Sequence, residues 1–277
     1  MHAPSPTIAL IGAGRVGLNL LRHCMRREVA VSAVVEPNPE RLELIRQLLP
    51  ASQVTAEVPS HFPEGTRYVV IAVPDRTIGE IARQLSTMKC LPQGLVLFHC
   101  SGTLDSSVLA PLAHNGCIVG SVHPMQSFPY DALPDDALRG IGCGIEGDDA
   151  FWHAGREFAA LMEWRPLRID ARKKALYHAA NVFAGNFPTV LAALAESLLR
   201  EAAIAAEDER LTHLIPMMSA VVGRLADSDP ASSLTGPAAR GDQDTIRLHL
   251  EELATLDPRF REIYEALTRA ALELLGK

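Results

Sequence analysis

The stretch TIALIGAGRVG, residues 7–17, decides the fold. It begins as an apolar run, which predicts a buried strand, and continues into a G-x-G-x-x-G pattern at the start of a helical segment. In a dinucleotide-binding unit the first glycine allows a tight turn, the second lets the backbone approach a pyrophosphate, and the third allows close helix packing. The helix N-terminus attracts the phosphate charge. We therefore expect a cofactor-binding loop formed by Gly12, Ala13, Gly14, Arg15, Val16 and Gly17.

An acidic residue stands where this pattern requires one. Glu36 ends the second apolar run, 19 residues after Gly17. A carboxylate there would accept hydrogen bonds from the adenosine ribose and disfavour a 2′-phosphate, so we expect NAD rather than NADP. Arg41 is close enough in sequence to keep NADP open. The alternative is a glycine-rich turn that binds no ligand.

The first half of the chain alternates apolar runs with amphipathic stretches. Near-continuous Val, Ile and Leu runs suit parallel strands covered on both faces, and their alternation with helices predicts an α/β, doubly wound Rossmann sheet. We expect strands at residues 7–12, 29–36, 67–74, 94–102, 117–124 and 140–147. We expect helices at residues 15–27, 39–49, 77–87 and 104–115, then a helix and a short strand within 150–169.

The composition changes after Asp170, where strand signals stop and Ala, Leu and Glu dominate. We expect a dinucleotide-binding domain at residues 1–169 and an all-helical domain at 170–277. Pro188 should kink or break the first long helix, because proline lacks a donor and clashes with the preceding turn, and Pro216 is expected to act likewise. The helices are expected at 171–186, 188–206, 208–226, 242–256 and 258–275, with a long loop at 227–242.

The bulk composition excludes several classes of protein. The 277 residues carry a formal net charge of −7, which argues against a nucleic-acid binder. No uninterrupted apolar run reaches about 18 residues, so we expect no membrane span. The N-terminus lacks the features of a signal peptide, and the five cysteines fall in no paired or metal-ligand spacing. We expect a cytoplasmic protein with reduced thiols and no metal.

Two further strand ends should line the dinucleotide path, because ligands of doubly wound sheets bind beyond the carboxyl ends of the strands. Val73 and Pro74 end one strand, and Ser101 and Gly102 end the next. Asp75 follows the first of these strands. A role for Asp75 in ligand binding and a role in turn formation are equally open.

The segment KKALYHAANVFAGN, residues 173–186, places three polar side chains on one side of a helix. At about 100° per residue, Lys174, His178 and Asn181 fall within about 60° of one another. A cationic Lys can stabilise or protonate the charge that hydride transfer leaves on a substrate, and His can act as general acid or base. The alternative is a solvated Lys beside an interhelical His–Asn hydrogen bond. Tyr177 is expected to be a packing residue.

Two loops carry further candidates. His123 and Ser127 lie in HPMQSF, residues 123–128, after a strand at the sheet edge. There we expect His123 to act in catalysis, against the alternative of a turn histidine, and Ser127 to bind substrate. In LTGPAARGD, residues 234–242, we expect Thr235 and Arg240 to bind substrate, while Asp242 caps the next helix. His99 and Cys100 should point to opposite faces of their strand, which argues against a Cys–His dyad.

These motifs together resemble those of a known protein group. The pieces GAGRVG, IAVPD, HCSGTLD, HPMQSF, KKALYHAANVFAGN and LTGPAARGD are similar to bacterial Rossmann-like proteins with a C-terminal domain of unknown function, number 2520. That family falls in the 6-phosphogluconate dehydrogenase-like group. The resemblance implies a Rossmann domain, a helical domain and a homodimer through the latter, which would complete the site. In related β-hydroxyacid dehydrogenases a catalytic Lys begins the helical domain, and Lys174 resembles it; the Asn expected four residues later is His178 here.

The sequence therefore predicts an NAD(P)-dependent oxidoreductase that transfers hydride to or from a small polar substrate, such as a 2-oxo acid, a hydroxy acid or an imine. Lys174 is expected to act as acid and stabiliser, with His178 and Asn181 orienting the substrate. One alternative is a dinucleotide-binding sensor without turnover. A second is a hydrolase or lyase that uses the fold for another nucleotide.

Overall fold

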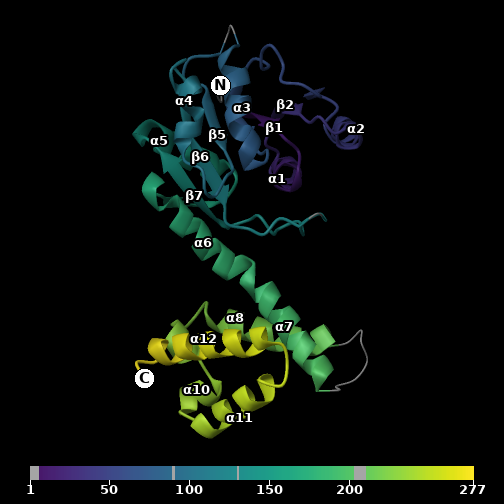
Figure 1. Cartoon of the computed structure of the whole chain (residues 1–277). Helices are drawn as coiled ribbons and strands as arrows, with labels where there is room; N and C mark the ends of the chain where they lie inside the picture. Colours follow the sequence, from purple (N-terminus) through teal and green to yellow (C-terminus); the bar gives the residue numbers. More distant parts are fainter. Residues whose placement is uncertain (1–5, 89–90, 130, 203–209) are drawn as a thin grey trace. The chain divides into compact units, whose positions relative to one another are not determined.

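The computed structural model describes residues 6–88, 91–129, 131–202 and 210–277 (Figure 1). The chain forms two compact units, one up to Asn186 and one from Phe187 onward. The expected domain boundary after residue 169 stays a prediction. The first compact unit extends past it because the helix that starts at Lys174 is anchored to the sheet through Ser121 and Glu146.

The first unit is built on an eight-stranded sheet with the strand order β3-β2-β1-β4-β5-β6-β7-β8. All neighbouring strands are parallel except β6 and β7, so the fold class expected from the sequence is confirmed. The short edge strand β3 was not predicted, because three residues carry no detectable alternation. The strands are β1 (Thr7–Ile11), β2 (Val31–Val35), β3 (Gln53–Thr55), β4 (Thr66–Ile71), β5 (Val96–His99), β6 (Ile118–Pro124), β7 (Gly142–Gly147) and β8 (Arg165–Arg168).

Helices flank this sheet much as the periodicity predicts. They are α1 (Arg15–Arg26), α2 (Pro39–Leu48), α3 (Asp75–Ser86), α4 (Ala110–Ala113), α5 (Asp149–Leu161) and α6 (Lys174–Gly185), with 3₁₀ turns η1 (Ser106–Leu109) and η2 (Ala171–Lys173). The single helix expected at 104–115 is wrong, since η1 and α4 replace it. Pro111 explains the break, because it has no N–H to donate to the carbonyl one turn earlier.

Each face of the sheet buries its own apolar cluster. Along β1, Ile8 and Leu10 pack on one side with Phe151 and Phe158 of α5. Ala9 and Ile11 pack on the other side, with residues of α3 such as Ile78 and Leu85. This alternation covers both faces and leaves the strand ends as the place where a ligand can approach the backbone.

The second unit contains only helices among its described residues. These are α7 (Phe187–Glu201), α8 (Arg210–Arg224), α9 (Pro230–Ser233), α10 (Gly236–Arg240), α11 (Gln243–Leu253) and α12 (Pro258–Leu274). The expected break at Pro188 is confirmed, since α6 ends at Gly185 and α7 begins at Phe187. Pro216 does not break its helix, because α8 continues through it, as the helix expected at 208–226 does; a kink there stays a prediction. The ends expected at 206 and 208 lie outside the described residues.

The long loop expected at 227–242 is also wrong, because it contains α9 and α10. Asp229 caps α9 with its carboxylate, and Pro230 occupies the first turn, where a missing N–H costs nothing. Pro237 has the same role in α10, which ends at Gly241 with a φ of 71°. The Pro and Gly residues that indicated a loop in fact begin and end two short helices.

One segment is long and apolar enough to cross a membrane by length and composition. The helical stretch Ala171–Glu201 has a mean hydropathy of 1.4 over its most apolar window, none of which is buried. This differs from the expectation drawn from uninterrupted runs. Apolar helices that pack against other protein pass the same test, so the finding alone places nothing in a bilayer.

We predict that Gly17→Ala destabilises the first unit. A Cβ on Gly17 would lie 2.0 Å from the Gly12 carbonyl oxygen, so α1 must shift. Such overpacking costs about 1–3 kcal/mol. Gly14→Ala is the matched control, because a Cβ there meets nothing within 4 Å. Thermal unfolding measures both variants, and equal melting temperatures would contradict the prediction.

Candidate active site

The glycine loop has the geometry that its pattern requires. Gly12 has a φ of 90°, and a Cβ on it would lie 2.7 Å from Val73 Cγ1. Gly17 lets α1 pack against the loop, whereas Gly14 faces open space and is the N-cap of α1. The loop thus presents its backbone and a helix N-terminus to a ligand, as a pyrophosphate site requires.

The carboxylate of Glu36 braces this loop. Glu36 is only 2% exposed, and its Oε2 accepts a hydrogen bond of 2.9 Å from the Ala13 N–H. Its Oε1 accepts from the Asn38 N–H at 2.8 Å and from Arg41 Nη2 at 3.0 Å. Both oxygens are therefore engaged by the chain itself. The contact of Glu36 with a ribose stays a prediction.

A cavity of about 1100 Å³ lies beside the loop, at the carboxyl ends of β1, β2 and β4. Gly12, Val73 and Pro74 line it, as the expected dinucleotide path requires. Its charged lining residues are Glu57 and Glu80, and no Lys or Arg is among its described lining. Its size and its apolar walls fit the adenosine half of a dinucleotide.

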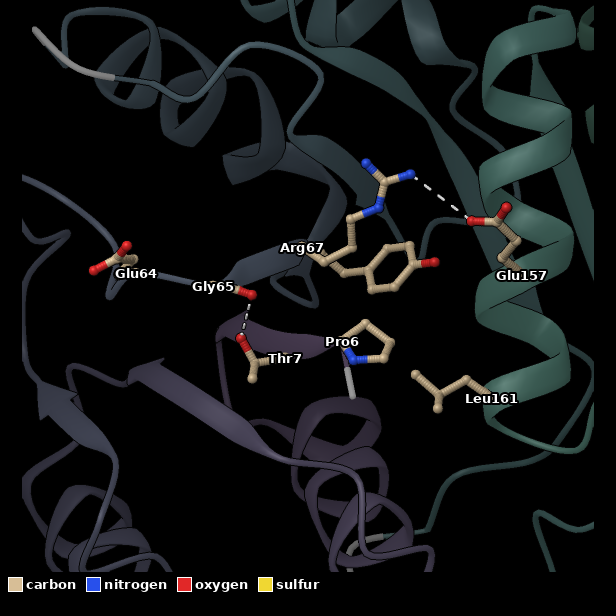
Figure 2. A pocket seen from close by; sticks show the side chains of 8 residues that line it. Pro6, Thr7, Glu64, Gly65, Arg67, Glu157 and Leu161 are labelled. Atoms are coloured by element: carbon tan, nitrogen blue, oxygen red, sulfur yellow. Dashed lines mark hydrogen bonds and ion pairs between the residues drawn. The ribbon is translucent and has the colours of Figure 1, made fainter. Parts of the chain in front are cut away.

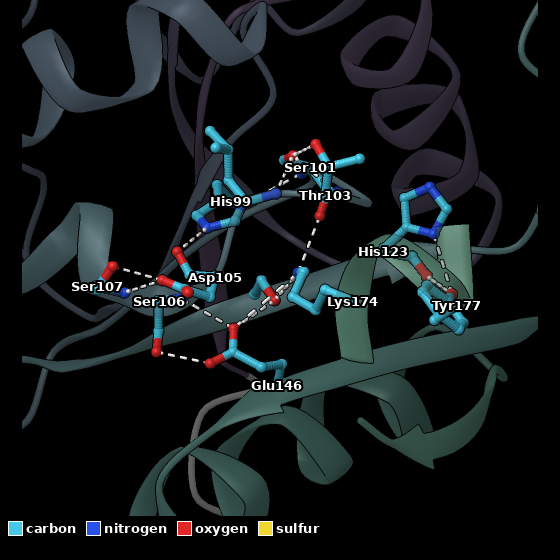
Figure 3. A network of polar contacts seen from close by, with 12 residues as sticks. His99, Ser101, Thr103, Asp105, Ser106, Ser107, His123, Glu146, Lys174 and Tyr177 are labelled. Atoms are coloured by element: carbon cyan, nitrogen blue, oxygen red, sulfur yellow. Dashed lines mark hydrogen bonds and ion pairs between the residues drawn. The ribbon is translucent and has the colours of Figure 1, made fainter. Parts of the chain in front are cut away.

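Lys174 lies at the centre of a buried polar network (Figure 3). It is 2% exposed, and its Nζ donates to the Ser101 carbonyl oxygen at 3.1 Å and to Ser121 Oγ at 2.5 Å. Glu146 Oε2 lies 4.0 Å from the same nitrogen. Burial lowers the pKa of Lys174 to about 8, against the opposing effect of the nearby Glu146 carboxylate. The ammonium therefore points into the first unit, where it joins α6 to three strands.

Glu146 is a functional candidate that the sequence reasoning missed. Its carboxylate is 5% exposed and accepts hydrogen bonds from the Ser106 N–H at 2.9 Å and from Ser106 Oγ at 2.8 Å. Ser121 Oγ donates to it at 3.1 Å. The available signal was a charged residue inside GIGCGIEG, a segment that otherwise reads as a buried strand.

His123 is held by Tyr177, so the expectation that Tyr177 only packs is incomplete. The Tyr177 hydroxyl lies 3.0 Å from His123 Nδ1 and 3.3 Å from the His123 carbonyl oxygen. The hydroxyl has one proton, so it donates either to the carbonyl oxygen or to Nδ1, and donation to Nδ1 would leave the ring proton on Nε2. Burial, with a smaller contribution from the neighbouring His178, lowers the pKa of His123 to about 4. The imidazole is thus neutral at pH 7.

Gly102 provides the space in which two imidazoles meet. A Cβ on Gly102 would lie 2.2 Å from His178 Cδ2 and 3.0 Å from His123 Nε2. The two rings are 5.6 Å apart between centroids. The ends of β5 and β6 and the second turn of α6 therefore converge, and any side chain at position 102 would separate them.

A polar pocket of about 390 Å³ opens beside these rings. Of the expected residues, His123, His178, Asn181 and Ser127 line it, whereas Lys174 does not. Asn181 Nδ2 donates to the Tyr177 carbonyl oxygen at 2.8 Å, which leaves its amide oxygen for a ligand. The full lining is His123, Met125, Gln126, Ser127, His178, Asn181, Val182, Ala184, Gly185 and Asn186.

Ser101 and Asp75 form a turn at the same edge of the sheet. Ser101 Oγ donates to Asp75 Oδ2 at 2.7 Å and accepts from the Leu104 N–H at 3.0 Å. Behind them, His99 accepts from the Ser101 N–H through Nδ1, and burial lowers its pKa to about 4. Burial also raises the pKa of the Cys100 thiol to about 12, which agrees with the expectation that no reactive dyad forms here.

The remaining expectations concern the second unit, metals and thiols. Asp242 caps α11 by accepting from the Thr245 N–H at 3.1 Å, as expected. Thr235 is the N-cap of α10, and Arg240 Nη2 lies 3.9 Å from Asp242 Oδ2. Binding of a substrate by Thr235 and Arg240 stays a prediction. Among the described residues there is no cluster that could hold a metal, and the described cysteines are free. Cys90 lies outside the described residues.

A second large cavity, of about 800 Å³, lies at the opposite edge of the sheet (Figure 2). Thr7 and Arg67, at the starts of β1 and β4, line it together with Glu157 of α5. Ligands of doubly wound sheets bind beyond the carboxyl ends of the strands. We therefore place the candidate site at the glycine loop and the histidine pocket.

Comparisons with known families and structures agree with this fold. Residues 1–124 match a Rossmann-like domain, and residues 141–271 match a domain of unknown function, DUF2520. No curated protein matches the chain. A candidate NADP oxidoreductase from Bacteroides fragilis is similar in structure, with 24% identity, 97% of this chain and 98% of that chain covered, and a TM-score of 0.75.

Two further solved structures are similar in fold. The protein TM1727 from Thermotoga maritima has 25% identity and a TM-score of 0.73, over 97% of this chain and 98% of that one. A pyrroline-5-carboxylate reductase from Coxiella burnetii has 14% identity and a TM-score of 0.64, over 98% of both chains. These likenesses show that the fold extends over nearly the whole chain.

We predict that His123 makes stability fall in mild acid. Its pKa lies near 4 in the folded protein and at 6.5 when unperturbed, so the unfolded chain binds more protons between these values. The stabilisation is complete above about pH 6.5 and is lost as the pH falls toward 4, by up to about 3 kcal/mol. Urea unfolding at pH 7 and pH 5 should show a smaller loss in His123→Gln. The exposed His153→Gln serves as control, and identical losses in all three proteins would contradict the prediction.

Proposed function

We propose that this chain, a Rossmann-like protein with a C-terminal DUF2520 domain, is an oxidoreductase that uses a nicotinamide dinucleotide to reduce or oxidise a small polar substrate. One observation carries the proposal: the open glycine loop and the histidine pocket lie at the same carboxyl edge of the sheet. Structures of similar fold include pyrroline-carboxylate reductases and imine reductases. Their activities support a redox reaction as the general class.

The dinucleotide would be held by the glycine loop and by the cavity beside it. When bound, a nicotinamide supplies or accepts the hydride. We propose a preference for NAD, because the cavity carries Glu57 and Glu80 and no described cation, and Arg41 is already paired with Glu36. These carboxylates would repel a 2′-phosphate. The glycine loop would bind the pyrophosphate, and Gly14 would let it approach.

Within the histidine pocket the proposed roles differ by position. His178 lines the pocket and would exchange a proton with the substrate. His123, held by Tyr177, would donate a hydrogen bond through Nε2 and orient the substrate. Asn181 and Ser127 supply further hydrogen-bonding groups on the pocket wall. Lys174 would contribute positive potential from behind the Ser101 carbonyl, since its Nζ points into the protein.

The pocket suits a small 2-oxo acid, hydroxy acid or imine, because it combines hydrogen-bonding groups with limited volume. A dinucleotide-binding sensor without turnover is the second candidate. The buried Lys174 favours it, since the only Lys of the expected catalytic set does not line the pocket. Oxidation of NADH by a substrate panel distinguishes the two.

We also propose that the protein is a homodimer through its helical segments. Leu176 and Phe183 of α6 are 68% and 69% exposed, and Met217 and Val222 of α8 are exposed as well. A second copy would cover these side chains, as the resemblance to dimeric relatives implies. Thr235 and Arg240 would then be placed to act on the substrate of the partner copy.

We predict that purified protein binds NADH saturably and more tightly than NADPH. Nicotinamide fluorescence and the melting temperature follow the titration. Gly14→Ala should fold normally yet bind NADH at least about tenfold more weakly, because its methyl group would occupy the space of the pyrophosphate. Absence of binding of either nucleotide at millimolar concentration would remove the proposal.

We predict that replacing Leu176 and Phe183 together by Asp yields a monomer, because buried charges oppose the interface. Sedimentation velocity measures the change. The double substitution Glu43→Ala/Glu64→Ala, at exposed positions of the first unit outside α6, is the control and should leave the mass unchanged. A wild-type protein that sediments as a monomer, or that floats with lipid vesicles, would argue against the homodimer.

A further inference from the structure

The peptide between Ser101 and Gly102 connects the buried lysine to the histidine pocket. The peptide group is planar and trans, so its carbonyl and its N–H point in opposite directions. The Ser101 carbonyl oxygen accepts from Lys174 Nζ at 3.1 Å, on the buried side. The Gly102 N–H therefore points away from Lys174.

Among the backbone N–H groups from Ser101 to Leu104, all of them described residues, that of Gly102 alone has no acceptor. The Ser101 N–H donates to His99 Nδ1 at 3.2 Å, and the Thr103 N–H donates to Ser101 Oγ at 3.2 Å. Gly102 itself is buried. Gly102 itself is not among the described lining residues of the pocket, but the two imidazoles beside it are. Buried backbone donors are nearly always paired, so an unpaired one beside these rings indicates a place for a ligand atom.

The surroundings of Gly102 fit an oxygen that carries negative charge. His123 Nε2 and His178 Cδ2 lie 3.0 Å and 2.2 Å from where a Cβ on Gly102 would be, and both rings line the pocket. No Asp or Glu is among the ten described lining residues. A cationic iminium substrate would need a carboxylate as partner, whereas a carbonyl oxygen or a carboxylate needs donors.

We propose that the Gly102 N–H, polarised by Lys174 through the Ser101 carbonyl, donates to the carbonyl oxygen of a 2-oxo acid and stabilises the charge that forms there. Lys174 is then a positioning residue that never touches the substrate. This inference rests on the proposed function, which it narrows from small polar substrates to 2-oxo acids.

The reaction balances as a two-electron reduction. The carbonyl carbon would gain a hydride from the reduced nicotinamide, which is oxidised in turn, and the electron pair of the C=O π bond would move onto oxygen. The Gly102 N–H and His123 Nε2–H would hold that oxygen while it takes one proton, delivered by His178 and restored from solvent. The product is the 2-hydroxy acid. Donors arranged in advance for such an oxygen are a major source of rate enhancement.

The polarisation can be tested by NMR in the free protein. Lys174 faces Glu146 of β7, Asp105 before η1, Asp75 of α3 and the Cys100 thiol, and its pKa lies near 8. The imidazoles of His99 and His123 also interact with its charge, but burial keeps their pKa values near 4, below this pH range. When Lys174 loses its proton, the Gly102 amide should become a weaker donor. We expect its proton and nitrogen resonances to shift between about pH 7 and 9 in ¹⁵N-glycine protein. The Gly94 amide, which donates to Gly116, should not shift.

Two variants separate polarisation from loss of structure. Lys174→Met should abolish the pH-dependent shift of Gly102. Glu146→Gln removes the carboxylate that raises the pKa of Lys174 but keeps the Lys174–Ser101 hydrogen bond. The pH-dependent shift of Gly102 should therefore persist, with its midpoint at a lower pH. A Gly102 resonance that stays constant over this pH range in the wild type would overturn the inference, whether or not Lys174→Met folds.

Ligand contact is tested with oxamate, a carboxylate that mimics a 2-oxo acid, added to protein saturated with NADH. We expect a downfield shift of the Gly102 amide proton and at least about tenfold weaker oxamate binding in Lys174→Met, with NADH binding unchanged. Failure of wild-type protein to bind NADH would refute the proposed function itself. NADH binding without any oxamate effect on Gly102 would refute only the 2-oxo acid assignment.

Discussion

The buried ammonium of Lys174 is the interaction on which the arrangement of the site depends. One nitrogen reaches the end of β5 through the Ser101 carbonyl, β6 through Ser121, and β7 through Glu146. A buried charge is costly unless it is paired and hydrogen-bonded, so these partners fix where α6 can begin. His178 and Asn181 follow on the next turns of the same helix, so the anchoring of Lys174 sets their position at the pocket.

The sequence reasoning succeeded where periodicity and glycine chemistry act locally. The apolar run before Gly12 predicted β1, Gly12 and Gly17 have the turn and packing roles that their spacing implies, and Gly14 faces open space. It also grouped Lys174, His178 and Asn181 on one helix. It could not tell that Lys174 points inward, because the partner that stabilises its charge, Glu146, is 28 residues away in a strand whose pairing is invisible in sequence.

The errors of the sequence-based prediction have a common physical origin. Pro and Gly between residues 227 and 242 indicated a loop, but proline is tolerated in a first helical turn and glycine ends a helix well, so the same residues fit two short helices. Pro111 had the opposite effect and divided an expected helix. Tyr177 was assigned to packing because its hydroxyl partner, His123, is 54 residues away. Local patterns show where Pro and Gly interrupt or end an element, whereas contacts between distant residues decide which element forms there.

The bracing of the glycine loop by Glu36 has a consequence for how this protein can evolve. The carboxylate that would discriminate between the two nicotinamide dinucleotides also holds the Ala13 amide and the Arg41 guanidinium. A lineage that changed its coenzyme through this position would loosen the loop that binds either coenzyme. Adaptation should therefore begin with compensating changes around Asn38 and Arg41, and descendants are expected to differ in this short segment as a linked set.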